Sequence, residues 1–144
     1  MNGCEIVEAT PDDSEEIMEL DKFGNSEPRI LEEYLSPIDP TMVKKYFILL
    51  AKIDGKAVAK VEIAIGERSE GSVAVLRRLV VHPSFRMRGI ATELVRKAID
   101  RAKIEGVGFV DLHVLENNAP AIRLYEKLGF EVRHKEIHFR KGIG

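Results

Sequence analysis

The sequence has few of the features that mark secreted, membrane or nucleic-acid-binding proteins. Its 144 residues include a single cysteine, Cys4, no tryptophan and only 6% aromatic residues. One cysteine cannot form an internal disulfide, and no apolar run approaches the roughly 20 residues that span a bilayer. The formal net charge is −2, with acidic and basic residues interspersed, unlike the strongly basic surface of a nucleic-acid binder. We therefore expect a cytoplasmic protein that contacts neither membrane nor nucleic acid.

Length and the lack of internal repeats predict one domain. A chain of 144 residues is long enough to bury a single core, and no linker or low-complexity segment divides it. We therefore expect residues 1–144 to fold together. Cys4 has no evident partner base, so we interpret it as an unreactive thiol.

Two helices are predicted near the start of the chain, after a strand at residues 4–9. Thr10 followed by Pro11 is a typical helix start, and we expect this helix to run to Phe23. A second helix is expected at 29–35, before two turn signals that contain proline.

The middle of the chain predicts a hairpin and a further strand. The pair Asp54-Gly55 suits the type I′ turn that matches strand twist, which predicts strands at 46–53 and 56–65. A polar turn is expected at 66–71, followed by a strand at 73–81.

The remaining elements alternate between helix and strand. A helix is predicted at 89–105, a buried strand at 108–115 and a short helix at 119–128. Strand, helix, strand and helix in this order predict an α/β fold with a mixed, partly parallel sheet. The first of these helices carries an apolar stripe at helical spacing, formed by Ala91, Leu94, Val95, Ala98, Ile99 and Ala102.

The segment LVVHPSFRMRGIAT, residues 79–92, predicts a binding site for a phosphate. Arg86, Gly89 and Ala91 fall at the spacing R-x-x-G-x-A where a strand gives way to a helix. The first N–H groups of a helix have no partner inside it, and the helix dipole makes that end partly positive. Gly89 and Ala91 allow an anion to approach closely, and Arg86 and Arg88 add positive charge.

This segment resembles the acetyl-CoA loop of the GCN5-related N-acetyltransferases, which reads Q/R-x-x-G-x-G/A. A second block, NAPAIRLYEKLGF at 118–130, is similar to the N-x-x-A-x-x-L-Y-x-x-x-G-F segment of the same family. Together the two blocks cover most of residues 72–130. A Rossmann-like alternative fails because the loop lacks G-x-G-x-x-G and comes late in the chain.

The resemblance implies a mixed central sheet flanked by helices, with splayed strands that hold acetyl-CoA. The backbone of the strand at Leu79 and Val81 would pair with the pantetheine arm, and Asn118 would bond it across the gap. The diphosphate would lie on the N–H groups from Met87 to Thr92. The residues expected to bind acetyl-CoA are Leu79, Val80, Val81, Arg86, Met87, Arg88, Gly89, Ile90, Ala91, Thr92 and Asn118.

Acetyl transfer to an amine requires a base, a donor to the oxyanion and an acid for the leaving thiolate. The resemblance makes Tyr125 the acid, although a core aromatic is the simpler alternative, and a backbone N–H such as that of Val81 the oxyanion donor. His113 matches the position where relatives carry a Glu or His that relays the amine proton. It could also be a structural strand histidine that shares a face with Asp111. Glu62 is a rival base, with an outward-facing charge as its alternative.

The resemblance implies that the acceptor is a primary amine of a small metabolite, or a protein N-terminus or lysine. An α-amine has a pKa near 8, so about a tenth of it is neutral at pH 7, and a modest base such as histidine suits it. Arg77 and Arg78 should point to opposite faces of their strand. One of them could hold an acceptor carboxylate, or form a surface ion pair.

Two further expectations concern partners. Residues 130–141 are too short for the tyrosine-containing loop of peptide-specific relatives, so the acceptor site is open or is completed by a second subunit in a homodimer. The alternative function is a catalytically silent acyl-CoA-binding regulatory module. No metal site is predicted, because His134 and His138 lie too far apart in this segment and His82 is a loop residue.

Overall fold

The computed structural model describes residues 3–24 and 43–144. The chain forms two compact units, Met1–His113 and Val114–Gly144, which we describe separately. The helix predicted at 29–35 and the turns that follow it lie outside the described residues.

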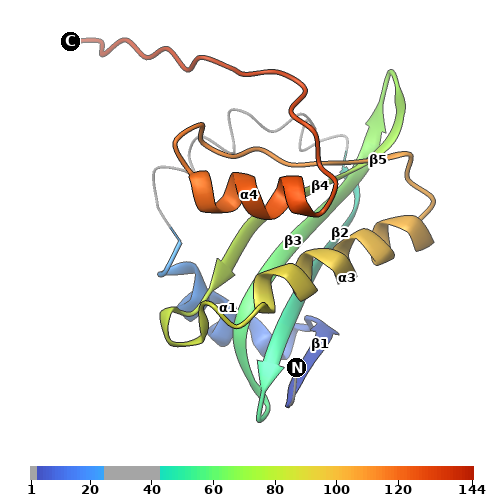
Figure 1. Cartoon of the computed structure of the whole chain (residues 1–144), viewed down its shortest axis with the longest axis vertical. Helices are drawn as coiled ribbons and strands as arrows, with labels where there is room; N and C mark the ends of the chain where they lie inside the picture. Colours follow the sequence, from blue (N-terminus) through green and yellow to red (C-terminus); the bar gives the residue numbers. More distant parts are fainter. Residues whose placement is uncertain (1–2, 25–42) are drawn as a thin grey trace. The chain divides into compact units, whose positions relative to one another are not determined.

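The first unit is built on a five-stranded mixed sheet (Figure 1). Neighbouring strands pair antiparallel from β1 to β4, whereas β4 and β5 are parallel. This confirms the mixed, partly parallel sheet. In spatial order the strands are β1 (Cys4–Glu8), β2 (Val43–Ile53), β3 (Lys56–Arg68), β4 (Gly71–Val81) and β5 (Phe109–Asp111).

The hairpin of β2 and β3 turns as predicted at Asp54 and Gly55. Their φ angles are 52° and 78°, so both central residues have the positive φ of a type I′ turn. The polar turn predicted at 66–71 is present but shorter, because β3 continues to Arg68 and β4 starts at Gly71, which leaves Ser69 and Glu70 as the turn. Cross-strand pairing at the end of this hairpin outweighs the turn preference of its glycines.

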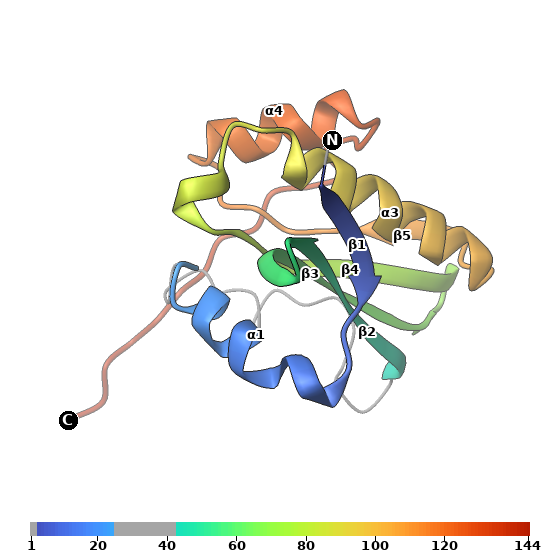
Figure 2. The same cartoon turned by 90° about the horizontal axis from the view of Figure 1, so that it is seen from below.

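Helices cover both faces of the sheet (Figure 2). A short 3₁₀ turn at Pro11–Asp13 leads into α1 (Ser14–Asp21) on one face. The Thr10 N–H donates to the Asp13 carboxylate at 2.8 Å and so closes the start of this segment. The other face is covered by α3 (Ile90–Ile104), which connects β4 to β5. It buries Ile90, Leu94, Val95, Ala98 and Ala102, whereas Ala91 and Ile99 of the predicted stripe are only partly buried.

The parallel pairing of β4 and β5 is short. It joins residues 73–75 of β4 to residues 109–111 of β5 and then ends. The buried strand predicted at 108–115 is therefore too long, and Phe109 is 49% exposed. A run of apolar residues indicates a strand but cannot reveal how many of them find a pairing partner. His113 lies beyond the end of β5, so the prediction that it is a strand residue is wrong.

The second unit contains α4 (Ala119–Lys127) followed by a segment without regular secondary structure. The Asn118 Oδ1 accepts from the Ala121 N–H at 3.3 Å, which caps the helix. Gly129 ends it with a φ of 93°. No helix in residues 3–24 or 43–144 is both long and apolar enough to cross a membrane.

Candidate functional site

The loop between β4 and α3 is tied to the end of β4. A 3₁₀ turn at Pro83–Phe85 follows the strand, and the His82 Nδ1 accepts from the Ser84 N–H at 3.0 Å. The Arg86 Nε donates to the Val81 carbonyl at 3.0 Å, and the Arg88 guanidinium lies 5.0 Å from the centre of the Phe85 ring. Both arginines therefore hold the loop as well as charging it.

The start of α3 is open to a ligand. Gly89 precedes the helix with a φ of 77°, and no side chain of the described residues caps this end. The first bond of the helix runs from the Glu93 N–H to the Gly89 carbonyl, so the N–H groups of Ile90, Ala91 and Thr92 precede it. A Cβ on Gly89 would meet nothing within 4 Å. Glycine is needed here for its backbone angle and for approach from outside, not for space within the protein.

The end of β4 offers a free backbone edge. The His82 N–H donates to the Val58 carbonyl of β3 at 2.8 Å. Because hydrogen bonds alternate along an antiparallel ladder, the N–H and carbonyl of Val81 point to the opposite edge. The contact between Arg86 and the Val81 carbonyl agrees with this direction. Since β5 stops pairing at Val75, no strand in the described part of the chain pairs with the edge of residues 76–81, which we call the open edge of β4.

A β-bulge changes the direction of side chains in the middle of β4. Lys60 pairs with Val80 but Glu62 pairs with Arg77, so β4 has one extra residue in this interval. Arg78 has a φ of 53°, in the left-handed region. Both arginines consequently approach Glu62, with Arg77 Nε at 3.8 Å and Arg78 Nη1 at 3.4 Å from its Oε1. The expectation that they point to opposite faces is wrong, as is a simple surface ion pair.

Glu62 is buried, which contradicts an outward-facing charge. It is 2% exposed, and the Tyr46 hydroxyl donates to its Oε1. Its Oε2 lies 2.5 Å from Lys60 Nζ, which is itself 2.6 Å from Asp21 Oδ1 of α1. We call this group the Glu62 cluster; its members are Asp21, Tyr46, Lys60, Glu62, Arg77 and Arg78.

The contacts of Glu62 limit what it can do chemically. Both oxygens are engaged by cations or by the Tyr46 hydroxyl, and the carboxylate is shielded from solvent. A general base needs an oxygen within reach of the proton it removes. Glu62 therefore acts best as the centre that holds Lys60, Arg77 and Arg78 together. Removing one member of such a buried ion pair typically costs about 3–5 kcal/mol.

Tyr46 was not singled out by the sequence patterns. Burial, followed by the hydrogen bond to Glu62 and the negative charge of that carboxylate, raises the pKa of Tyr46 well above its ordinary value of 10.0. Tyr46 therefore remains a neutral hydrogen-bond donor. One signal was present in the sequence: Lys60 and Glu62 are two charged residues, two positions apart, inside an otherwise apolar strand.

The other predicted site residues are distributed between the two units. The first unit contains the loop between β4 and α3, the open edge of β4 and the Glu62 cluster. His113 is the last residue of this unit and is partly buried. Asn118 and Tyr125 belong to the second unit. There the Tyr125 ring packs edge-on against Phe130 at 5.7 Å, so it has a packing contact whatever its chemical role.

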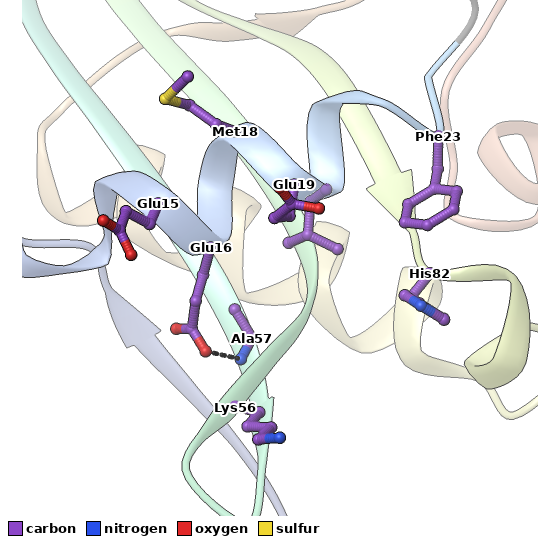
Figure 3. Close-up of a pocket in the computed structure, with 9 residues that line it drawn as sticks. Glu15, Glu16, Met18, Glu19, Phe23, Lys56, Ala57 and His82 are labelled. Atoms are coloured by element: carbon purple, nitrogen blue, oxygen red, sulfur yellow. Dashed lines mark hydrogen bonds between the residues drawn. The ribbon is translucent and has the colours of Figure 1, made fainter.

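A groove of about 440 Å³ lies beside α1 (Figure 3). Phe23 and His82 face each other there with ring centres 4.7 Å apart, and the Glu16 carboxylate accepts from the Ala57 N–H at 3.3 Å. His82 is among its lining residues, but the described lining includes none of the residues predicted to bind acetyl-CoA or to catalyse the reaction. Among the described residues, no three His, Cys, Asp or Glu side chains are placed to hold a metal ion.

Comparisons with known proteins found similar sequences and a similar fold. The sequence matches the Acetyltransferase (GNAT) family over residues 13–130. It is 32% identical over 143 residues to an uncharacterized N-acetyltransferase of Methanocaldococcus jannaschii, covering 92% of this chain and 62% of that protein. It is 34% identical over 85 residues to the L-amino acid N-acetyltransferase AaaT of Escherichia coli K12, covering 58% of this chain and 52% of that protein. The chain thus spans less than two thirds of either relative.

A solved structure confirms the fold. The aminoglycoside N-acetyltransferase AAC(6')-Iy, bound to a bisubstrate analogue that contains CoA, superposes with a TM-score of 0.73. The match covers 97% of this chain and 99% of that one at 22% sequence identity. At this identity the likeness concerns the fold alone.

The Glu62 cluster predicts an unusual titration of Tyr46. In the folded protein Tyr46→Phe should leave the tyrosinate absorbance change around pH 10 unaltered, because Tyr46 does not ionise there. In denaturant the same substitution should remove one of three tyrosine signals. Because the folded state holds this proton more tightly than the unfolded state, the free energy of unfolding falls as pH rises beyond about 10. Loss of a full tyrosine signal from the folded variant would contradict the described contact.

Proposed function

Because the chain belongs to the acetyltransferase (GNAT) family, we propose that it is an acetyl-CoA-dependent N-acetyltransferase. The acceptor is a primary amine of a small metabolite, or a protein N-terminus or lysine. The observation that carries the proposal is the uncapped start of α3 behind Gly89, next to the open edge of β4. An anion and an extended chain would each find unpaired backbone groups in these two neighbouring places.

The residues present fit acetyl-CoA. The N–H groups from Met87 to Thr92 would receive the diphosphate, with positive charge from Arg86 and Arg88. The backbone of Leu79 to Val81 would pair with the pantetheine arm. Asn118 uses its Oδ1 to cap α4, which leaves its amide N–H groups as donors to that arm. When bound, acetyl-CoA supplies the acetyl thioester.

Three groups of this chain would carry the chemistry. The Val81 N–H, directed to the open edge of β4, would stabilise negative charge on the reacting carbonyl oxygen. Tyr125 would donate a proton to the departing sulfur, and His113 would accept the proton of the amine. His113 is preferred to Glu62 because the oxygens of Glu62 are already engaged within its cluster.

A matched pair of glycine variants tests the proposed phosphate-binding site at the start of α3. Gly89 and Gly106 stand at opposite ends of α3 with φ angles of 77° and 80°, and a Cβ would meet nothing within 4 Å at either. Gly89→Val and Gly106→Val should therefore strain the backbone similarly. Only Gly89→Val should weaken acetyl-CoA binding, by about tenfold or more, as expected for a lost hydrogen bond to a charged group. Calorimetric titration with acetyl-CoA measures this. Equal affinities for the two folded variants would place the diphosphate elsewhere.

The activity is tested by release of the CoA thiol from acetyl-CoA in the presence of amines. Amino acids, polyamines with aminoglycosides, and short peptides form three acceptor pools. The wild-type protein should release CoA with at least one pool. Tyr125→Phe should bind acetyl-CoA normally but turn over about 10²–10⁴-fold more slowly, as for a lost general acid. Wild-type turnover in this variant would make Tyr125 a packing partner of Phe130. Tight binding without release from any pool would favour the silent acyl-CoA-binding module.

The proposed base predicts a change in the pH dependence of kcat/KM. The wild-type profile should contain a rising limb from deprotonation of the base, separate from the limb set by the amine itself. His113→Ala should lose the limb of the base. His134→Ala is the control, because His134 is exposed and paired with Glu136 in the other unit. An identical profile in His113→Ala and in the wild type would remove His113 from the mechanism.

A further inference from the structure

Arg77 has hydrogen-bonding capacity that the described residues do not use. Its side chain is only 24% exposed, and its buried Nε has no hydrogen-bond partner. The nearest carboxylate oxygen, Glu62 Oε1, is 3.8 Å away, which is beyond a hydrogen bond. The guanidinium lies 5.6 Å from the centre of the Tyr46 ring. An arginine has five N–H donors in a planar fork, and leaving the buried Nε–H unpaired is unfavourable.

The carboxylate nearest to Arg77 is already engaged by other groups. Glu62 has Lys60 on one oxygen, and the Tyr46 hydroxyl and Arg78 on the other. Among the described residues, Lys60 and Arg78 therefore each donate a hydrogen bond to Glu62, whereas the Arg77 Nε lies 3.8 Å from it. Arg77 is thus the cation of the Glu62 cluster whose N–H groups could donate to a further carboxylate.

Arg77 is placed where an acceptor could reach it. The cluster includes Asp21 of α1, so it lies on the sheet face that α1 covers, opposite the face covered by α3 (Figure 2). Arg77 precedes Leu79 on β4 by two residues, a separation of about 7 Å along a strand. An amine whose carboxylate contacts the Arg77 guanidinium would thus lie near the open edge of β4.

We propose that Arg77 binds a carboxylate of the acceptor, which makes the substrate class an amine that also carries a carboxylate. This rests on the proposed N-acetyltransferase function. The carboxylate is that of a free amino acid or of an acidic side chain next to a peptide N-terminus. The planar guanidinium suits a bidentate contact with either one. Polyamines and aminoglycosides would instead bring several positive charges close to the guanidinium groups of Arg77 and Arg78.

The test compares acceptors that differ only in the carboxylate. The kcat/KM for CoA release is measured with the L-amino acids and with their α-amides, and with peptides that begin Met-Asp or Met-Asn. Spermidine and kanamycin serve as polycationic acceptors. The wild-type protein should prefer the acid member of one pair by about 10- to 100-fold, the range for a charge-assisted hydrogen bond. The pair that shows the preference identifies the source of the carboxylate.

The variants are Arg77→Gln and Arg77→Lys, with Lys44→Gln as the control. Lys44 is an exposed cation of β2 that contacts Glu67 at 3.4 Å. Arg77→Gln should lower kcat/KM for the acid to the value for its neutral partner, and Arg77→Lys should recover part of the preference. Lys44→Gln should keep all of it. Because both acceptors are assayed with the same protein preparation, the ratio of their kcat/KM values does not depend on the folded fraction of a variant.

Two results would overturn the inference. One is a wild-type preference for spermidine or kanamycin over every carboxylate-bearing acceptor. The other is an Arg77→Gln variant that keeps the wild-type ratio between the acid and its neutral partner. In both cases CoA would still be released, so the proposed function would stand. Failure of the proposed function is recognised separately, as an absence of acetyl-CoA binding or as binding without release of CoA with any acceptor.

Discussion

The short pairing between β4 and β5 is the constraint on which the site depends. Three residue pairs join the two strands, and β5 then ends at Asp111 while β4 continues to Val81. The remaining edge of β4 keeps backbone groups that a longer β5 would have bonded. The loop that follows β4, which contains Arg86, leads directly to the start of α3, where no side chain of the described residues caps the helix. In the proposed acetyl-CoA site, an extended arm and a phosphate would therefore find their partners along one continuous stretch, residues 76–92.

The opposite edge of β4 is arranged around a bulge. The extra residue at Arg78 brings two arginines to one carboxylate, where a regular strand would have separated them. Glu62 is buried and is compensated by Lys60, Tyr46 and Arg78, so the arrangement avoids an isolated charge. The proposed acetyl-CoA site consists mainly of backbone groups of residues 79–92, whereas the proposed contact with the acceptor is made by the side chain of Arg77. A family of related enzymes can thus retain the first while changing the second.

Sequence patterns within short segments were sufficient to predict several local features of the fold. The type I′ turn at Asp54, the apolar stripe of α3 and the glycine before it follow from local conformational and burial preferences. The Glu62 cluster did not, because its members come from α1, β2, β3 and β4 and meet only through strand register. The bulge shifts that register by one residue, and the amino-acid sequence around Arg78 gives no sign of a bulge. The length of β5 was overestimated for the same reason, since pairing depends on the partner strand.

The most direct test of the central claim is a titration of the ¹⁵N-labelled protein with CoA, followed through the amide signals of its two-dimensional NMR spectrum. The account predicts that the largest changes occur at residues 79–81 and 87–92, on the open edge of β4 and at the start of α3. Saturable changes confined to other residues, with these amides unaffected, would contradict it.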